Sequence, residues 1–138
     1  MAGYSGTPLA KKLGIKSAFR IKLINAPGNY MQLFTDMPAE LYFEDDEVSK
    51  KDLIHFFTRQ KDELLTKLSI LKAQIKPDGM IWVSWPKKAS KVITDVTEDI
   101  IRNHALRIGL VDIKVCAIDE TWSGLKLVIP VKDRKASV

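Results

Sequence analysis

Residues 76–90 read Lys-Pro-Asp-Gly-Met-Ile-Trp-Val-Ser-Trp-Pro-Lys-Lys-Ala-Ser, a turn, an apolar run and a cationic loop in direct succession. The run from Met80 to Trp85 predicts a strand that is covered on both faces of a sheet. Pro77-Asp78-Gly79 is typical of a turn, here one that ends a helix, and Pro86 ends the strand. Because ligands of α/β domains bind at loops that follow such strands, the lysine-containing loop indicates where a site would lie.

A helix is expected on the N-terminal side of this strand. Mostly apolar residues recur there at spacings of three and four, as they do on one face of an amphipathic helix. They are Leu53, Phe56, Phe57, Gln60, Leu64, Leu68, Leu71 and Ile75. We therefore predict one long helix from Leu53 to Ile75 that packs on the sheet.

Four more strands are expected around the central one. Phe19–Asn25 and Val111–Ile118 alternate between apolar and polar residues, which is typical of strands at the edge of a sheet. Leu41–Phe43 is a short strand, and Leu125–Val131 pairs with Val111–Ile118 as an antiparallel hairpin. Strand–helix–strand units favour right-handed crossovers and parallel pairing. The predicted fold class is α/β, with three layers and a five-stranded, mostly parallel sheet whose last strand is antiparallel.

The turn Lys76-Pro77-Asp78-Gly79 and the hairpin over 110–131 resemble the later half of the Rossmann-like fold of S-adenosylmethionine-dependent methyltransferases. That resemblance implies a truncated version of the fold with strand order 1-2-3-5-4, so that Phe19–Asn25 and Val111–Ile118 form the two edges. In that family a glycine-rich turn follows the first strand and an acidic residue ends the next one. Here the turn is Asn25-Ala26-Pro27-Gly28-Asn29, with one glycine, so methyl transfer is not expected.

Three blocks of the chain carry a closer resemblance. They are Tyr4–Lys16 (YSGTPLAKKLGIK), Trp82–Ser90 (WVSWPKKAS) and Lys114–Lys126 (KVCAIDETWSGLK). Together they resemble a small bacterial family known only as a domain of unknown function. The resemblance implies a compact bacterial cytosolic protein, and it supplies no catalytic residues.

Size and composition are those of an ordinary globular protein. The 138 residues, 46% of them hydrophobic, predict a single α/β domain over 1–138 with flexible ends at 1–6 and 133–138. The net charge is +5, but 22 basic residues are spread among 17 acidic ones, so a solvated basic surface is favoured over a nucleic-acid interface. No membrane span or targeting segment is expected. One cysteine, Cys116, suits a reducing compartment, and we expect a cytoplasmic protein.

Three loops are expected to meet at the carboxyl edge of the sheet and to form a ligand pocket there. Its predicted residues are Asn25, Gly28, Asn29, Tyr30, Trp85, Lys87, Lys88, Ser90, Asp119, Glu120, Trp122 and Ser123. In this pocket, Trp85 and Trp122 would stack on a planar group, and Lys87 and Lys88 would neutralise an anion. We call this set the predicted rim site.

Each part of the predicted rim site also has a structural interpretation. Trp85 and Trp122 could equally cover the sheet edge, and Lys87 and Lys88 could be solvated loop charges. Asp119 and Glu120 are adjacent and so point apart on an extended chain, which makes an ion pair with one of the lysines a better expectation than an acid/base pair.

No metal or cofactor site is predicted. His55 and His104 lie without a second cysteine or a spaced carboxylate that would complete a metal-binding set. The favoured function is a non-catalytic domain that binds a small anionic ligand or an acidic peptide at the rim. The alternatives are a small enzyme that uses Lys87 or Lys88 with Asp119 or Glu120, and a homodimer or protein-interaction module that pairs through Phe19–Asn25 or Val111–Ile118.

Overall fold

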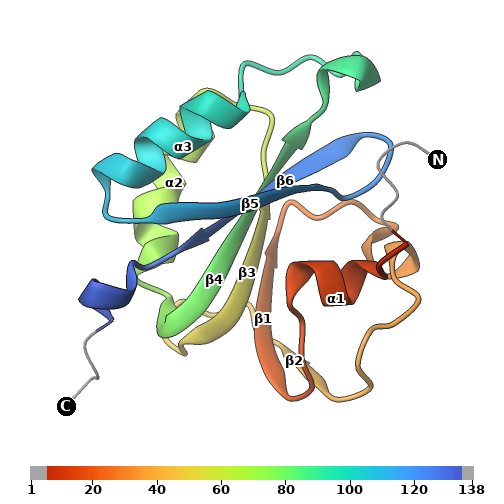
Figure 1. Cartoon of the computed structure of the whole chain (residues 1–138), viewed down its shortest axis with the longest axis vertical. Helices are drawn as coiled ribbons and strands as arrows, with labels where there is room; N and C mark the ends of the chain where they lie inside the picture. Colours follow the sequence, from red (N-terminus) through yellow and green to blue (C-terminus); the bar gives the residue numbers. More distant parts are fainter. Residues whose placement is uncertain (1–5, 135–138) are drawn as a thin grey trace.

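The computed structural model describes residues 6–134, which form one six-stranded sheet with helices on both faces (Figure 1). The strands are β1 (Phe19–Ile24), β2 (Leu41–Phe43), β3 (Lys51–Phe57), β4 (Ile75–Pro86), β5 (Val111–Ala117) and β6 (Trp122–Val128). The helices are α1 (Leu9–Leu13), α2 (Lys61–Lys72) and α3 (Glu98–Arg107), with short 3-10 segments η1 (Tyr30–Leu33), η2 (Lys88–Ser90) and η3 (Val131–Asp133). The order is β2-β1-β3-β4-β6-β5, and β6 runs antiparallel to the other five strands. The predicted α/β class with a mostly parallel sheet is confirmed, although the sheet has one strand more than expected.

Strand β4 is central and covered on both faces, as its sequence predicts. Every residue from Ile81 to Pro86 is buried. Because side chains alternate along a strand, Trp85 contributes to the cluster that contains α2 and α3, and Trp82 to the cluster that contains α1. The sheet is thus the middle of three layers, with α2 and α3 on one face and α1 on the other (Figure 1).

The long helix predicted over Leu53 to Ile75 is wrong. Residues 51–57 form β3, and the helix α2 occupies only Lys61–Lys72. Six of the seven β3 residues are buried, so its apolar residues are a continuous strand run covered on both sides, and the helical spacing was a coincidence of that run with the apolar face of α2. A short run of this kind does not distinguish helix from strand.

The prediction that Pro77-Asp78-Gly79 ends a helix is also wrong, because these residues lie inside β4. Lys51 pairs with Ile75 and Leu53 pairs with Met80, so the β4 chain bulges out between these two registers. Gly79 is required there, since a Cβ at this position would lie 2.9 Å from the carbonyl oxygen of Lys51.

The predicted order 1-2-3-5-4 is wrong on one side of the sheet. Strand β1, expected at the edge as Phe19–Asn25, lies between β2 and β3, and β2 is the outermost strand. The alternation of β1 has another cause: Lys22, on the α2 side, is buried and donates to Gln74 Oε1 at 2.9 Å. At the other side β5 is the outermost strand and forms the predicted hairpin with β6.

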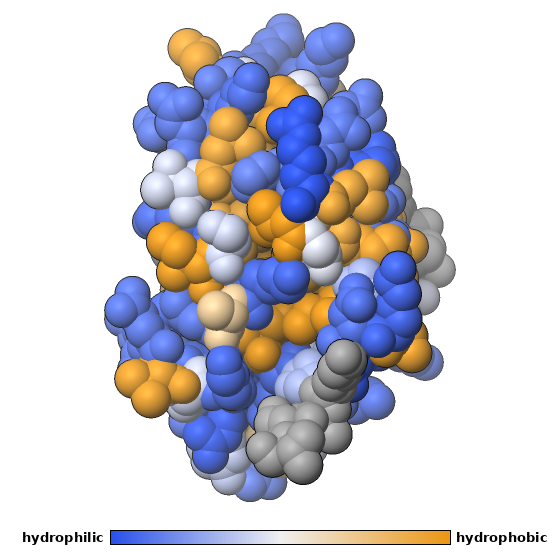
Figure 2. Space-filling model, turned by 90° about the vertical axis from the view of Figure 1, so that its left-hand side faces the viewer, coloured by the Kyte–Doolittle hydropathy of each residue, from blue (hydrophilic) through white to orange (hydrophobic). Residues whose placement is uncertain are grey.

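Hydrophobic side chains remain exposed on the helical side of the molecule, where they form a broken band between hydrophilic ones (Figure 2). Ile70 of α2, Leu106 of α3 and Ile113 of β5 are each between 52% and 54% exposed. Within residues 6–134, the outer edge of β5 has no strand partner. Pairing of two copies through Val111–Ile118 stays a prediction. Pairing through Phe19–Asn25 loses its basis, because both sides of β1 are occupied.

The predicted flexible ends lie for the most part outside the described residues. Gly6 and Asp133 belong to the described part, and Asp133 ends the short 3-10 segment η3. None of the helices between residues 6 and 134 has both the length and the apolar character needed to cross a bilayer.

Candidate ligand site at the edge of the sheet

The two tryptophans of the predicted rim site do not face one another. Trp85 pairs with Ser123 and Pro86 pairs with Trp122, so the two indoles project from opposite faces of the sheet. Trp85 is 8% exposed and packs in the α2/α3 cluster, whereas Trp122 packs on the α1 side, edge to face with Phe57 at a centroid distance of 5.0 Å. The prediction that one ligand stacks between them is therefore wrong. Trp122 is paired with the neighbour of Trp85, and successive residues of a strand point to opposite faces.

Two of the predicted loops do meet. The amide of Lys87 donates to the carbonyl oxygen of Thr121 at 2.7 Å, which joins the loop after β4 to the hairpin loop. Asp119 Oδ1 accepts from the amides of Thr121 and Trp122 at 2.8 and 2.7 Å, so this carboxylate shapes the hairpin turn. The expected ion pair to Lys87 or Lys88 is absent from residues 6–134.

Other rim residues hold the backbone of their own loops. Ser90 Oγ donates to the carbonyl oxygen of Lys87 at 2.6 Å, and Lys88 and Glu120 are exposed. Gly28 and Asn29 are exposed and precede η1. A Cβ at Gly28 would meet nothing within 4 Å, so no close backbone approach requires glycine there.

Asn25 closes the crevice between the carboxyl ends of β1 and β3. Its Nδ2 donates to the carbonyl oxygen of Phe57 at 3.0 Å and to Glu63 Oε2 at 3.1 Å, and Thr58 donates to the other oxygen of Glu63 at 2.7 Å. Asn25 adopts the left-handed conformation, with φ at 58°, which Asn tolerates better than most residues. In doubly wound sheets this crevice, where the strand order reverses, is the usual ligand position, and here a side chain occupies it.

Tyr30 is not a rim residue but part of a buried polar chain. Its hydroxyl lies 2.9 Å from His55 Nδ1, and His55 Nε2 lies 2.8 Å from Ser84 Oγ. Burial lowers the pKa of His55 to about 3 and raises the pKa of Tyr30 above its usual range, so the imidazole is neutral near neutral pH. His55 and Ser84 have no exposed surface, and the chain connects η1 to β3 and β4.

The polar chain of Tyr30, His55 and Ser84 was not predicted from the sequence, because His55 was expected on a helix. On β3, the side chains of His55 and Phe57 point to the same face and their rings stack at a centroid distance of 4.2 Å. The available signal was the continuous apolar run around His55, which is typical of a buried strand.

A cavity of about 470 Å³ opens at the β2 edge of the sheet. Its lining residues are Ile21, Leu23, Met31, Phe43, Glu44 and Asp45, and we call it the edge cavity. It exists because β2 ends early: the last β1–β2 pair is Ile21 with Phe43, the amide of Glu44 donates to the carbonyl oxygen of Ile21 at 2.8 Å, and β1 continues to Ile24. The cavity is thus a notch beside the second half of β1, with η1 on its other side.

Of the two carboxylates that line the edge cavity, Glu44 and Asp45, only one is free. Glu44 pairs with Arg20 at 3.1 Å and accepts from Ser49 Oγ at 3.0 Å. Asp45, in contrast, is exposed and makes no hydrogen bond or ion pair with any residue between 6 and 134. A bound hydrogen-bond donor could therefore use Asp45 without breaking an existing contact.

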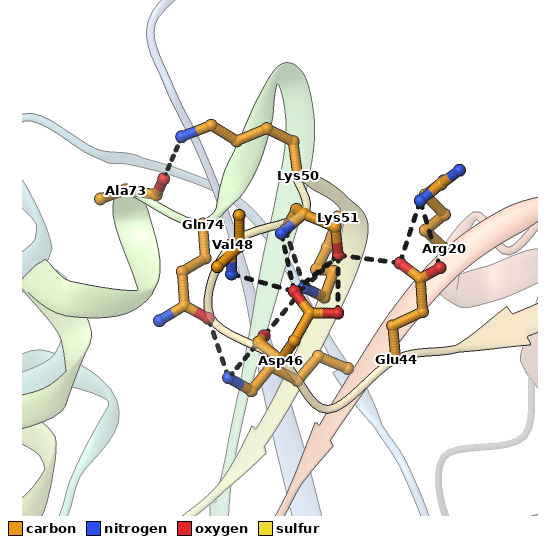
Figure 3. Close-up of polar contacts among 10 residues, drawn as sticks. Arg20, Glu44, Asp46, Val48, Lys50, Lys51, Ala73 and Gln74 are labelled. Carbon is orange, nitrogen blue, oxygen red and sulfur yellow. Dashed lines mark hydrogen bonds and ion pairs between the residues drawn. The ribbon is translucent and has the colours of Figure 1, made fainter.

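Two buried lysines, Lys22 and Lys51, fix the loop between β2 and β3, and Figure 3 shows the contacts of Lys51. Lys51, with no exposed side-chain surface, donates to the carbonyl oxygens of Asp46 and Ser49 at 3.0 and 2.7 Å and to Asp46 Oδ1 at 3.3 Å. Lys22 donates to the same Asp46 carbonyl oxygen at 3.3 Å. These contacts hold the loop over β1 in place of a crossover helix, and so they support the wall of the edge cavity.

Asp46 makes the stability of this loop depend on pH. The amide and hydroxyl of Ser49, the amide of Val48 and the ammonium of Lys51 all donate to its carboxylate and hold the pKa of Asp46 well below its usual range. A depressed carboxyl pKa stabilises the fold above the unfolded value of about 3.9, and this contribution is lost as the pH falls below it.

We therefore expect Asp46→Asn to lower the free energy of unfolding relative to the wild-type protein at pH 6, and the difference to shrink towards pH 2.5. Urea unfolding at both pH values measures it. Glu47→Gln, at an exposed neighbour in the same loop, is the matched control and should leave stability unchanged at pH 6. A difference between Asp46→Asn and wild type that does not change with pH would contradict this role of Asp46.

Comparisons with known proteins agree on the fold and leave the activity open. A family model described as a protein of unknown function (DUF3052) matches residues 32–131. No curated protein matches the chain. Solved structures with a similar fold include a putative type 11 methyltransferase from Sulfolobus solfataricus, at 14% identity, a TM-score of 0.64 and 91% coverage of both chains.

Two further similar structures are also described as methyltransferases or methylases. Magnesium protoporphyrin IX methyltransferase from Synechocystis PCC 6803, solved with bound SAM, has 12% identity and a TM-score of 0.58 over 88% of this chain and 74% of that chain. The ribosomal protein L11 methylase from Lactobacillus delbrueckii subsp. bulgaricus has 10% identity and a TM-score of 0.58 over 88% and 75%. At these identities the likeness establishes a methyltransferase-type fold and nothing further.

Proposed function

Because the chain belongs to the DUF3052 family, whose description assigns no activity, we propose a function from the geometry: a non-catalytic domain that binds a small molecule of the nucleoside class in the edge cavity. The observation that carries this proposal is the composition of the cavity wall. Four apolar side chains and two adjacent carboxylates line a volume of about 470 Å³, within the usual range for small-molecule sites.

The chemistry of the wall favours a ligand that donates hydrogen bonds. Glu44 and Asp45 are acceptors when ionised, and they repel an anion that enters the cavity. Ribose hydroxyls are donors of the required kind, and a planar base is the kind of group that Leu23, Met31 and Phe43 would cover. The Synechocystis enzyme of similar fold was solved with bound SAM, a nucleoside derivative, which supports the choice of this class.

The geometry of β1 favours binding without catalysis. Asn25 bridges the crevice between β1 and β3, so a ligand would extend along β2 and not across the carboxyl ends of the central strands. The turn after β1 also lacks the glycine-rich sequence that methyltransferases use, with Gly28 as its single glycine.

The earlier expectation of an anionic ligand at the predicted rim site stays a separate prediction. Trp85 and Trp122 cannot stack on one ligand there, because they lie on opposite faces of the sheet. Lys87 and Lys88 remain available in a loop that is hydrogen-bonded to the hairpin. The enzyme alternative is weakened for Asp119, whose carboxylate oxygen is already used by two backbone amides.

Isothermal titration with adenosine, SAM and S-adenosylhomocysteine tests the proposal. We expect at least one of them to bind the wild-type protein, and Asp45→Asn to weaken that binding about tenfold or more, because a hydrogen bond to a charged group contributes about 1.5–3 kcal/mol.

Glu47→Gln is the matched control, since Glu47 belongs to the same acidic loop and does not line the cavity. Its affinity should equal that of the wild type. If none of the three compounds binds, or if Asp45→Asn binds as tightly as the wild type, the proposed site is wrong.

A further inference from the structure

Two lysines face one another at the opposite end of the sheet from the edge cavity. Lys114 of β5 and Lys126 of β6 are directly paired in the antiparallel ladder, two positions from the pair Cys116 with Gly124. Since alternate residues share a face, these lysines lie on the α1 side of the sheet, where Cys116 packs. Like charges at directly opposed positions destabilise a strand pair, so this arrangement carries an energetic cost in the protein alone.

Two further cations approach the pair. Burial is the main cause that lowers the pKa of Lys126, and the other causes are the charges of Lys114, Arg134 and Lys16. Arg134 is held in place by a hydrogen bond of 2.7 Å from its Nε to the carbonyl oxygen of Ile129. We call Lys16, Lys114, Lys126 and Arg134 the basic patch.

The charge of the basic patch is not balanced within the described structure. Ion pairs between residues 6 and 134 involve the cations Arg20, Lys51, Lys67, Lys76 and Arg102. No member of the basic patch takes part in one of them. Four cations, from the α1–β1 loop, β5, β6 and the residue after η3, therefore lie together without an ion-pair partner among residues 6–134.

We propose that the basic patch is an anion site for a phosphoryl or pyrophosphoryl group. A compact group with two or more negative charges would neutralise the opposed lysines and accept hydrogen bonds from ammonium and guanidinium donors at once. All four members of the basic patch are cations, so recognition rests on charge. The proposal is independent of the edge cavity, because the two sites lie at opposite ends of the strand order.

Titration of the whole chain with inorganic pyrophosphate and, separately, with ADP tests it. We expect binding in low salt that weakens as salt is added, and a loss of about tenfold or more in affinity for Lys126→Gln and for Lys114→Gln. Binding of both probes indicates that the free group suffices, and binding of ADP alone indicates a group carried on an organic molecule. Either result supports the phosphate chemistry.

Lys61→Gln is the matched control, since Lys61 is an exposed lysine at the start of α2, on the side of the sheet opposite the basic patch. It should bind like the wild type. The proposal is overturned if neither probe binds, if Lys126→Gln binds with unchanged affinity, or if Lys61→Gln loses as much affinity as Lys126→Gln.

A second measurement does not depend on the ligand. Removing one charge of the opposed pair should raise the melting temperature of Lys126→Gln above that of the wild type in about 0.01 M salt, and the difference should vanish in about 1 M salt, where charges are screened beyond about 3 Å. Equal melting temperatures at low salt would contradict the repulsion on which the anion site rests.

Discussion

Replacing Trp82 by alanine should lower the free energy of unfolding by about 3–5 kcal/mol, the range expected for a large aromatic side chain removed from a core. Trp82 has no exposed surface and is the largest fully buried side chain among residues 6–134. Its Nε1 donates to the carbonyl oxygen of Leu13 at 2.9 Å, which fixes the end of α1 to the sheet. The variant loses both the packing and this bond, and urea denaturation measures the loss.

Trp122→Ala is the control for this variant. Trp122 lies on the same face but is only partly buried, at the start of β6. We expect a smaller loss, because part of its ring already contacts solvent. A Trp122→Ala variant that is less stable than Trp82→Ala would mean that the α1 side of the core is centred elsewhere.

Lys51→Met should lower the free energy of unfolding by about 3 kcal/mol, since each hydrogen bond from a charged donor contributes about 1.5–3 kcal/mol. The Lys51 ammonium is the buried centre of the loop between β2 and β3, with Asp46 and Ser49 as its acceptors (Figure 3). Methionine is shorter than lysine by one atom, keeps most of the buried side chain and removes the donors, so the loop loses its attachment without creating a large cavity.

Lys50→Met is the matched control from the neighbouring position. Lys50 is exposed, and its single hydrogen bond goes to the carbonyl oxygen of Ala73. We expect a change within about 0.5 kcal/mol, because the Lys50 ammonium is exposed and water can replace the lost contact, whereas the Lys51 ammonium is buried. If Lys50→Met and Lys51→Met have equal stability, the loop is not held by the buried ammonium.

The sequence predicted the centre of the sheet well because its signals there are local. The apolar run of β4 and the hairpin of β5 and β6 are recognisable from short patterns of burial and alternation. The β3 strand was not recognisable in the same way. Its buried residues could equally be placed on a helix face, and only the tertiary position of β3 between β1 and β4 distinguishes the two.

The predicted sheet order is wrong for the same reason, the missing strand β3. Without β3, the alternation of β1 was best explained by an edge position, whereas the structure satisfies Lys22 inside the protein through Gln74 and the loop carbonyl of Asp46. A buried, hydrogen-bonded lysine cannot be told from a solvated one by its position in a sequence pattern.

The candidate site was only partly predictable for a related reason. Loop positions after strands could be read from the sequence, and the contact of Lys87 with Thr121 follows that expectation. The edge cavity depends instead on how far β2 extends along β1, which ends at the pair Ile21 with Phe43. Strand register of this kind is set by the assembled sheet and leaves no separate signal in the residues Glu44 and Asp45.

A backbone amide titration tests the proposed binding site most directly. When adenosine or S-adenosylhomocysteine is added to the ¹⁵N-labelled protein, the amide resonances of Leu23, Met31 and Phe43 to Asp45 should shift most. Shifts that gather at Lys87 to Ser90 and at Trp122, with none at the edge cavity, would contradict the assignment of this cavity as the ligand site.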